Sequence, residues 1–182
     1  MIIIDNFIED NNLLDEINND STFFTGNGQF KWWDGWWSSD ANTVKKRLIE
    51  YIWRYNSPDK GYDIQGFEYW TGQYGPDKPN KNLGNHYDKD ELHHKRTGEI
   101  VRPVVGTVFY PKDIPFKGGL LEIETEGETE SIKAKYNRLV IFNAGNDLHR
   151  VTEVTSGERF AIAINLWDTI PVGVAEGQLE QE

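Results

Sequence analysis

The chain has 182 residues, of which 37% are hydrophobic and 13% aromatic, so it is long and apolar enough to form one globular domain with a sizeable core. A formal net charge of −11 would repel phosphate backbones, so we expect no nucleic-acid partner. The absence of cysteine excludes disulfides and thiolate chemistry, and it leaves histidine and carboxylate side chains to bind any metal.

No apolar run approaches the length of a membrane span, and the apolar residues 1–4 are too few for a signal peptide. We therefore expect a cytoplasmic protein without a membrane partner. The sequence carries no signal for an oligomeric state.

The first part of the chain, to about residue 60, has the pattern of a helical lead-in. A short helix is predicted near residues 9–18. Apolar residues then recur at helical spacing from Val44 to Trp53, with Asp40 as the candidate N-cap and residues 57–59 as the end of this second helix.

From about residue 64 to residue 168 the pattern changes to short β-strands. Loops are predicted at residues 75–83 and 90–99, a turn at Ser156-Gly157, and a frayed C-terminus at residues 173–182. This order predicts a mainly β fold, a two-sheet barrel or jelly roll with supporting N-terminal helices, as a single domain over residues 1–182. Strands are predicted at residues 66–74, 103–110, 120–124, 131–136, 138–143, 149–155 and 159–167.

Three side chains could form a metal site, namely His86, Asp88 and His149, here called the His-Asp-His triad. On a strand, alternation with period two would place His86 and Asp88 on one face. His149 follows about 60 residues later, enough chain to cross a barrel and return. Two imidazoles and one carboxylate leave coordination positions open and suit non-haem Fe(II). A surface histidine beside a solvated carboxylate is the alternative interpretation of the short motif.

Arg159 lies ten residues after His149 and starts the strand predicted at residues 159–167. Period two would place it on one face with Ala161, Ala163 and Asn165, while large apolar residues occupy the other face. The small alanines leave room for a ligand that the guanidinium could bind bidentately through a carboxylate. The alternative is an exposed strand arginine paired with Glu153.

Other conspicuous residues have plainer interpretations. His93 and His94 are adjacent in a polar segment, so they are expected to be exposed, with contact to a substrate as the alternative. The tryptophans between Trp32 and Trp37 are interpreted as core or lid packing, with a substrate-facing aromatic wall as the alternative. Trp70 and Trp167 are expected to pack against the barrel.

Three motifs in this order resemble the Fe(II)/2-oxoglutarate-dependent dioxygenase superfamily, with its prolyl-4-hydroxylase-like branch closest in length and layout. The resemblance covers roughly residues 64–168 and implies a double-stranded β-helix of the jelly-roll or cupin type. The motifs are His86-x-Asp88, Gly118-Gly119-Leu120-Leu121, and His149-Arg150-Val151 followed by Gly157-Glu158-Arg159.

The resemblance also implies a role for each side chain. The triad would bind Fe(II), and Arg159 would bind the distal carboxylate of 2-oxoglutarate. Tyr110 matches a family tyrosine that assists with that carboxylate. Tyr74 matches a tyrosine upstream of the His-x-Asp motif, and Tyr69 competes for this match. Fe(II), the co-substrate 2-oxoglutarate and dioxygen would be required, with ascorbate as a possible addition.

The chain departs from some branches of the superfamily. Collagen-type prolyl hydroxylases usually have lysine where Arg159 stands, whereas arginine occurs in the oxygen-sensing and several bacterial branches. The nucleic-acid demethylases have a second arginine six residues later, where this chain has Asn165, which argues against alkylated-base repair. The halogenating relatives replace the carboxylate ligand, which Asp88 retains here.

The predicted function is therefore a dioxygenase that hydroxylates a C–H bond of a small molecule, peptide or protein, with a prolyl residue or a free amino acid as candidate substrates. The main alternative is a non-catalytic double-stranded β-helix module that binds a ligand or partner protein. A metal-dependent cupin-type isomerase or ring-cleaving enzyme is the third hypothesis.

Overall fold

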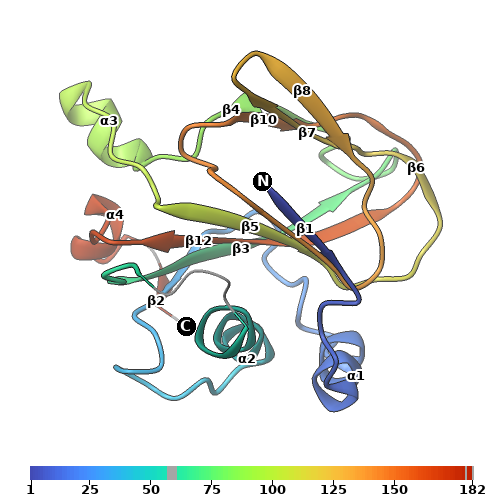
Figure 1. The fold of residues 1–182 in the computed structure, drawn as a ribbon, viewed down its shortest axis with the longest axis horizontal. Coiled ribbons are helices and arrows are strands. Elements are labelled where there is room, and N and C mark those ends of the chain that lie inside the picture. The colour runs from blue at the N-terminus through green and yellow to red at the C-terminus, as the bar shows by residue number, and fades with distance from the viewer. Residues whose placement is uncertain (57–60, 179, 182) are drawn as a thin grey trace.

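A computed structural model describes residues 1–56, 61–178 and 180–181 (Figure 1). The helices are α1 Asn11–Asn19, α2 Val44–Glu50, the π-helical turn η1 Tyr51–Tyr55, α3 Glu91–Thr97 and α4 Val172–Ala175. The strands are β1 Ile2–Asp5, β2 Lys31–Trp33, β3 Gly66–Tyr74, β4 Leu83–His86, β5 Val105–Tyr110, β6 Phe116–Gly118, β7 Leu121–Thr125, β8 Glu128–Ile132, β9 Arg138–Phe142, β10 Leu148–Val151, β11 Val154–Gly157, β12 Arg159–Trp167 and β13 Glu180–Gln181.

Two large sheets face each other. The major sheet has seven strands in the order β1-β9-β5-β12-β3-β2-β13, and the minor sheet has four in the order β4-β10-β7-β8. A further pair, β11 with β6, joins them at one end. Figure 1 shows α1 and α2 beneath the major sheet, on the side away from the minor sheet. The predicted mainly β jelly roll with N-terminal supporting helices is confirmed.

Strand β12 lies in the middle of the major sheet, antiparallel to both β3 and β5. Its even-numbered residues Ile162, Ile164 and Leu166 are fully buried against the helical side. The alternate residues turn toward the minor sheet and line a cavity between the sheets. The predicted division of β12 into an apolar face and a face with Arg159, Ala161, Ala163 and Asn165 is therefore confirmed, and the second face lines a cavity.

The helical lead-in differs from the prediction in its capping. Helix α2 begins after Thr43, whose side-chain oxygen accepts a hydrogen bond from the backbone N–H of Lys46 at 3.3 Å. The prediction that Asp40 is the N-cap is therefore wrong, because Thr43 accepts the hydrogen bond from the free N–H at the start of this helix. The predicted end of the helix at residues 57–59 lies outside the described residues.

Three segments expected to be irregular contain regular structure. Residues 91–97 form α3 rather than a loop, with Asp90 as the N-cap and Gly98 in the left-handed conformation after it. This helix buries none of its residues, so the sequence shows no apolar periodicity there. Ser156 and Gly157 belong to β11 rather than to a turn. The C-terminal segment, predicted to fray, contains α4, and β13 pairs with β2 in parallel.

Within the described residues, no helix is long and apolar enough to span a membrane.

Removal of side-chain volume from the helix-facing side of β12 should destabilise the fold. Leu166 is fully buried, so Leu166→Ala is expected to lower the free energy of unfolding by about 2–5 kcal/mol, measured by urea denaturation. Ile170→Ala is the control, because Ile170 is 52% exposed, and its effect should stay within about 0.5 kcal/mol. Equal effects of the two substitutions would contradict this placement of the core.

Candidate metal centre and co-substrate pocket

The two histidines of the triad lie side by side on neighbouring strands of the minor sheet. Strands β4 and β10 are antiparallel, and His149 is the direct partner of His86, with ring centroids 4.2 Å apart. Asp88 lies two residues beyond the end of β4, where its backbone N–H donates to the carbonyl oxygen of Ala144 at 2.9 Å. Asp88 thus reaches the site from just outside the strand rather than from the strand itself.

The ligand atoms of the triad point toward one point. One potential ligand atom from each residue lies within 4.8 Å of the other two. Asp88 Oδ1 is 3.5 Å from His86 Nε2 and 3.7 Å from His149 Nε2. Two imidazole nitrogens and one carboxylate oxygen at this spacing match the donor set and the open coordination of a non-haem Fe(II) site.

Backbone carbonyl groups fix the orientation of both imidazoles. Nδ1 of His86 lies 2.8 Å from the carbonyl oxygen of Gly84, and Nδ1 of His149 lies 2.9 Å from that of Asp147. A carbonyl oxygen only accepts, so each Nδ1 carries the proton and donates it. The lone pair therefore remains on each Nε2, the atom that faces the other triad members.

Electrostatics favour the neutral form of His149 that a metal requires. Burial lowers the pKa of His149 below its ordinary value, although the nearby Asp88 carboxylate acts in the opposite direction. Only 6% of His149 is exposed. A neutral buried imidazole retains the lone pair needed for coordination.

Asn165 holds the carboxylate of the triad. Its Nδ2 donates to Asp88 Oδ2 at 2.9 Å, which leaves Oδ1 directed at the two histidines. Asn165 is almost fully buried on β12 of the major sheet, so the two sheets meet at this hydrogen bond. The sequence placed Asn165 on the same face of the strand as Arg159, but its contact with Asp88 was not predicted.

Arg159 is buried deep in the same cavity. It is 2% exposed, its Nη2 donates to the Tyr110 hydroxyl at 3.1 Å, and its guanidinium carbon lies 5.7 Å from the centre of the Tyr74 ring. Its Nε has no hydrogen-bond partner among the described residues. The predicted alternative, an exposed arginine paired with Glu153, is therefore not formed.

A buried cation with an unsatisfied N–H needs an anionic partner. Burial raises the pKa of Tyr74, so its phenol stays neutral and can donate a hydrogen bond beside Arg159. Gly119 also makes room here, because a Cβ at that position would come within 2.9 Å of Arg159 Cδ. Arg159, Tyr74 and Tyr110 thus form a cradle with the chemistry to bind a carboxylate.

The triad, Arg159 and Tyr74 line one inner cavity between the sheets. Its walls come from both sheets: Trp70, Gly72, Tyr74, Leu83, Thr107, Val108, Leu121, Phe142, Val151, Arg159, Ala161, Ala163 and Asn165, together with the triad. The triad and the Arg159 guanidinium, whose Nε has no hydrogen-bond partner among the described residues, therefore share one cavity.

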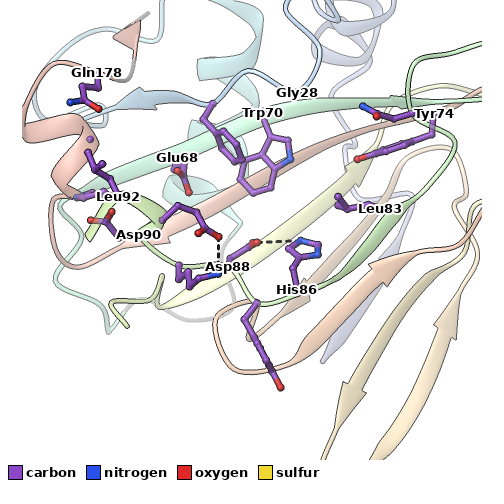
Figure 2. Close-up of a pocket in the computed structure, with 17 residues that line it drawn as sticks. Gly28, Glu68, Trp70, Tyr74, Leu83, His86, Asp88, Asp90, Leu92 and Gln178 are labelled. Atoms are coloured by element: carbon purple, nitrogen blue, oxygen red, sulfur yellow. Dashed lines mark hydrogen bonds and ion pairs between the residues drawn. The ribbon is translucent and has the colours of Figure 1, made fainter. Parts of the chain in front are cut away.

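A larger outer cavity of about 430 Å³ opens beside the triad (Figure 2). His86 and Asp88 line it, so a molecule bound there would contact the metal site. Strand β3 contributes Glu68 and Trp70, and α3 and α4 form the opposite side. Trp70, which was expected to pack against the barrel, also lines both cavities, and this was not predicted.

The remaining candidate residues lie away from the triad. Tyr69, the competitor of Tyr74, is fully buried in the core between the major sheet and the helices. Trp32 and Trp33 are buried and line neither cavity, in agreement with the packing interpretation. His93 and His94 lie on α3, where both contact Glu99.

The sequence model of the 2OG-Fe(II) oxygenase superfamily matches residues 69–167, which is more than half of the chain. The chain belongs to this superfamily. The name of the superfamily includes Fe(II) and 2-oxoglutarate (2OG). The triad has donor atoms suited to Fe(II), and the Arg159 cradle has groups suited to a carboxylate.

Two curated relatives are PKHD-type hydroxylases. The one from Hyphomonas neptunium is 50% identical over 54 residues, which is 30% of this chain and 24% of the relative. The one from Teredinibacter turnerae is 31% identical over 88 residues, or 48% of this chain and 38% of the relative. The matches therefore span about a quarter of one relative and about two fifths of the other.

Solved structures with the same fold include prolyl hydroxylases. A Pseudomonas putida prolyl-4-hydroxylase is 17% identical with a TM-score of 0.60, covering 93% of this chain and 88% of that one. A viral collagen prolyl hydroxylase from Paramecium bursaria Chlorella virus-1, in complex with 2-oxoglutarate, is 19% identical with a TM-score of 0.56, covering 93% and 96%. At these identities the similarity establishes the fold.

Loss of the amide that holds Asp88 should weaken metal binding. Asn165→Ala leaves the carboxylate free to turn, so the affinity for Mn(II), used in place of Fe(II), is expected to fall about tenfold or more in calorimetric titration. The exposed Asn12 on α1 provides the control variant Asn12→Ala, which should bind Mn(II) like the unmodified protein. Unchanged affinity in Asn165→Ala would contradict the positioning role.

Proposed function

We propose that this chain is a 2-oxoglutarate- and Fe(II)-dependent dioxygenase that hydroxylates a C–H bond. The observation that carries the proposal is the presence of the triad and of a buried guanidinium with a free N–H in one cavity. The triad offers two imidazole nitrogens and one carboxylate for the metal. Arg159 offers a fixed cation for an organic acid.

When bound, Fe(II) with 2-oxoglutarate supplies the oxidising chemistry that places one oxygen atom of dioxygen on the substrate carbon and converts the co-substrate to succinate and carbon dioxide. The protein contributes orientation and a water-poor cavity. Asn165 and the carbonyls of Gly84 and Asp147 keep the three ligand atoms in place before any metal arrives.

Arg159 would bind the distal carboxylate of 2-oxoglutarate. A guanidinium can donate two parallel hydrogen bonds to a carboxylate, and its burial here reduces competition from water. The hydroxyl of Tyr110 already contacts Arg159, and Tyr74 stands beside it, so both phenols can support the same carboxylate. Such a charge-assisted hydrogen bond contributes roughly 1.5–3 kcal/mol.

A peptide or protein is the first candidate substrate, with a prolyl residue as its candidate hydroxylation site. Prolyl hydroxylases are among the proteins that share this fold, and one of them, from Trichoplax adhaerens, was solved with a peptide fragment of hypoxia inducible factor (19% identity, TM-score 0.55, 92% of this chain and 83% of that one). The outer cavity beside the triad is wide enough to receive a side chain. The expected cytoplasmic location and the absence of a nucleic-acid partner stay predictions of the sequence.

Retention of the complete triad and of the buried arginine argues against the non-catalytic module. A module that only binds a partner through its surface would have no use for a buried guanidinium with an unsatisfied N–H. The buried Arg159 guanidinium also argues against the cupin-type isomerase, because an isomerase reaction needs no site for the carboxylate of a co-substrate.

The test is Fe(II)-dependent formation of succinate from 2-oxoglutarate, with and without prolyl peptides. Asp88→Ala removes the carboxylate ligand and is expected to abolish succinate formation. Arg159→Ala is expected to raise the half-saturating concentration of 2-oxoglutarate on the order of tenfold or more, because a charge-assisted hydrogen bond is lost.

The exposed Arg54, which pairs with Glu50 on the far side of the fold, provides the control Arg54→Ala. This variant should keep the ordinary requirement for 2-oxoglutarate. Full turnover in Asp88→Ala, or an Arg159→Ala variant that saturates like the control, would refute the proposed function.

A further inference from the structure

The outer cavity is strongly acidic. Four carboxyl groups line it, those of Glu68, Asp88, Asp90 and Glu91, and the same wall contains one lysine, Lys89. The Lys89 amine lies 2.7 Å from the Glu91 carboxylate, so its charge is already balanced. A ligand in this cavity would therefore meet more carboxyl groups than amines or guanidinium groups.

Two other carboxylates of this set have specific partners. Asp90 accepts backbone hydrogen bonds through both oxygens, from the N–H of His93 at 2.9 Å and from the N–H of Val172 at 2.6 Å. Asp88 accepts from Asn165 and directs its second oxygen at the two histidines. These carboxylates are engaged in capping and in the metal site.

Glu68 is different. In the part of the chain that the structure describes, no lysine or arginine forms an ion pair with it, although it lies on β3 next to Asp88. Its side chain lies near those of Asn165 and Trp167 and lines the outer cavity. A carboxyl group in this position can bind a cation that enters the cavity.

An aromatic surface adjoins this carboxyl group. Trp70 follows Glu68 by two residues on β3, so both side chains lie on the same face of the strand, and Figure 2 shows them directed into the cavity. The Trp70 ring lies 4.7 Å from that of Phe30, which is 46% exposed at the cavity mouth. Aromatic faces beside a carboxylate bind organic cations and their aliphatic stems.

We propose that the substrate of this enzyme carries an organic cation, an ammonium or a guanidinium group, which Glu68 binds against the ring of Trp70. The proposal rests on the proposed dioxygenase function for the reaction, and it adds the class of substrate. Lysine and arginine residues meet this requirement, as does proline with a free secondary amine. An internal peptidyl proline without a neighbouring cationic residue does not.

The test compares matched probes that differ only in charge. The full chain, loaded with Mn(II) and 2-oxoglutarate, is titrated calorimetrically with Nα-acetyl-lysine methylamide and with its norleucine counterpart, then with proline and N-acetylproline. We expect the cationic member of at least one pair to bind on the order of tenfold more tightly than its neutral partner. In Glu68→Gln this preference should fall to nearly none.

The exposed Glu130 on β8 provides a matched control, since Glu130→Gln removes the same charge away from the cavity. It should keep the preference for the cationic probe. Thermal unfolding of Glu68→Gln verifies its folding, and the comparison of probes on the unmodified protein decides the substrate class even if that variant fails to fold.

Two results would overturn the proposal. One is that the unmodified protein binds charged and neutral probes equally, or binds neither. Equal binding is also the result expected if Glu68 acts as a neutral hydrogen-bond donor. The other is an undiminished preference in Glu68→Gln. Binding of Mn(II) and 2-oxoglutarate is recorded before each probe is added, so failure of the dioxygenase assignment appears as a separate result.

Discussion

The direct pairing of His149 with His86 in the minor sheet is the constraint on which the site depends. Side chains alternate between the two faces of a strand, so a shift of one residue in this register would turn His149 to the outside of the sheet. The carbonyls of Gly84 and Asp147 then determine which imidazole nitrogen faces inward. The placement of the two imidazoles is therefore a property of one strand pair and two short backbone contacts, whereas Asp88 is held by Asn165 and by the carbonyl of Ala144.

The major sheet supplies the guanidinium and the amide that complete the site. Strand β12 carries Arg159 at one end and Asn165 near the other, and both point into the space between the sheets. On the opposite face, Ile162 and Ile164 are fully buried against the helices. The same strand thus supports the core and aligns the co-substrate cradle with the carboxylate ligand, so the packing that stabilises the fold also sets the separation of the two binding groups.

Much of this arrangement could be predicted from the sequence, because it depends on local alternation. The faces of β12 follow from period two, and the order of the triad and Arg159 carries the resemblance to the superfamily. The contact of Asn165 with Asp88 could not be predicted in this way, since it joins residues 77 positions apart in different sheets. The exposure of Glu68 to the outer cavity depends likewise on how the sheets face each other. Helix α3 did offer a signal in Asp90 and Gly98, but without an apolar stripe it resembled a loop.

Asp90 has a mechanical consequence for the outer cavity. One oxygen of its carboxylate caps α3 and the other accepts the N–H that begins α4, while Arg96 and Glu176 join the same two helices by an ion pair. Outward movement of either helix alone would break these contacts. The two helices therefore restrain each other and form one connected wall of the outer cavity.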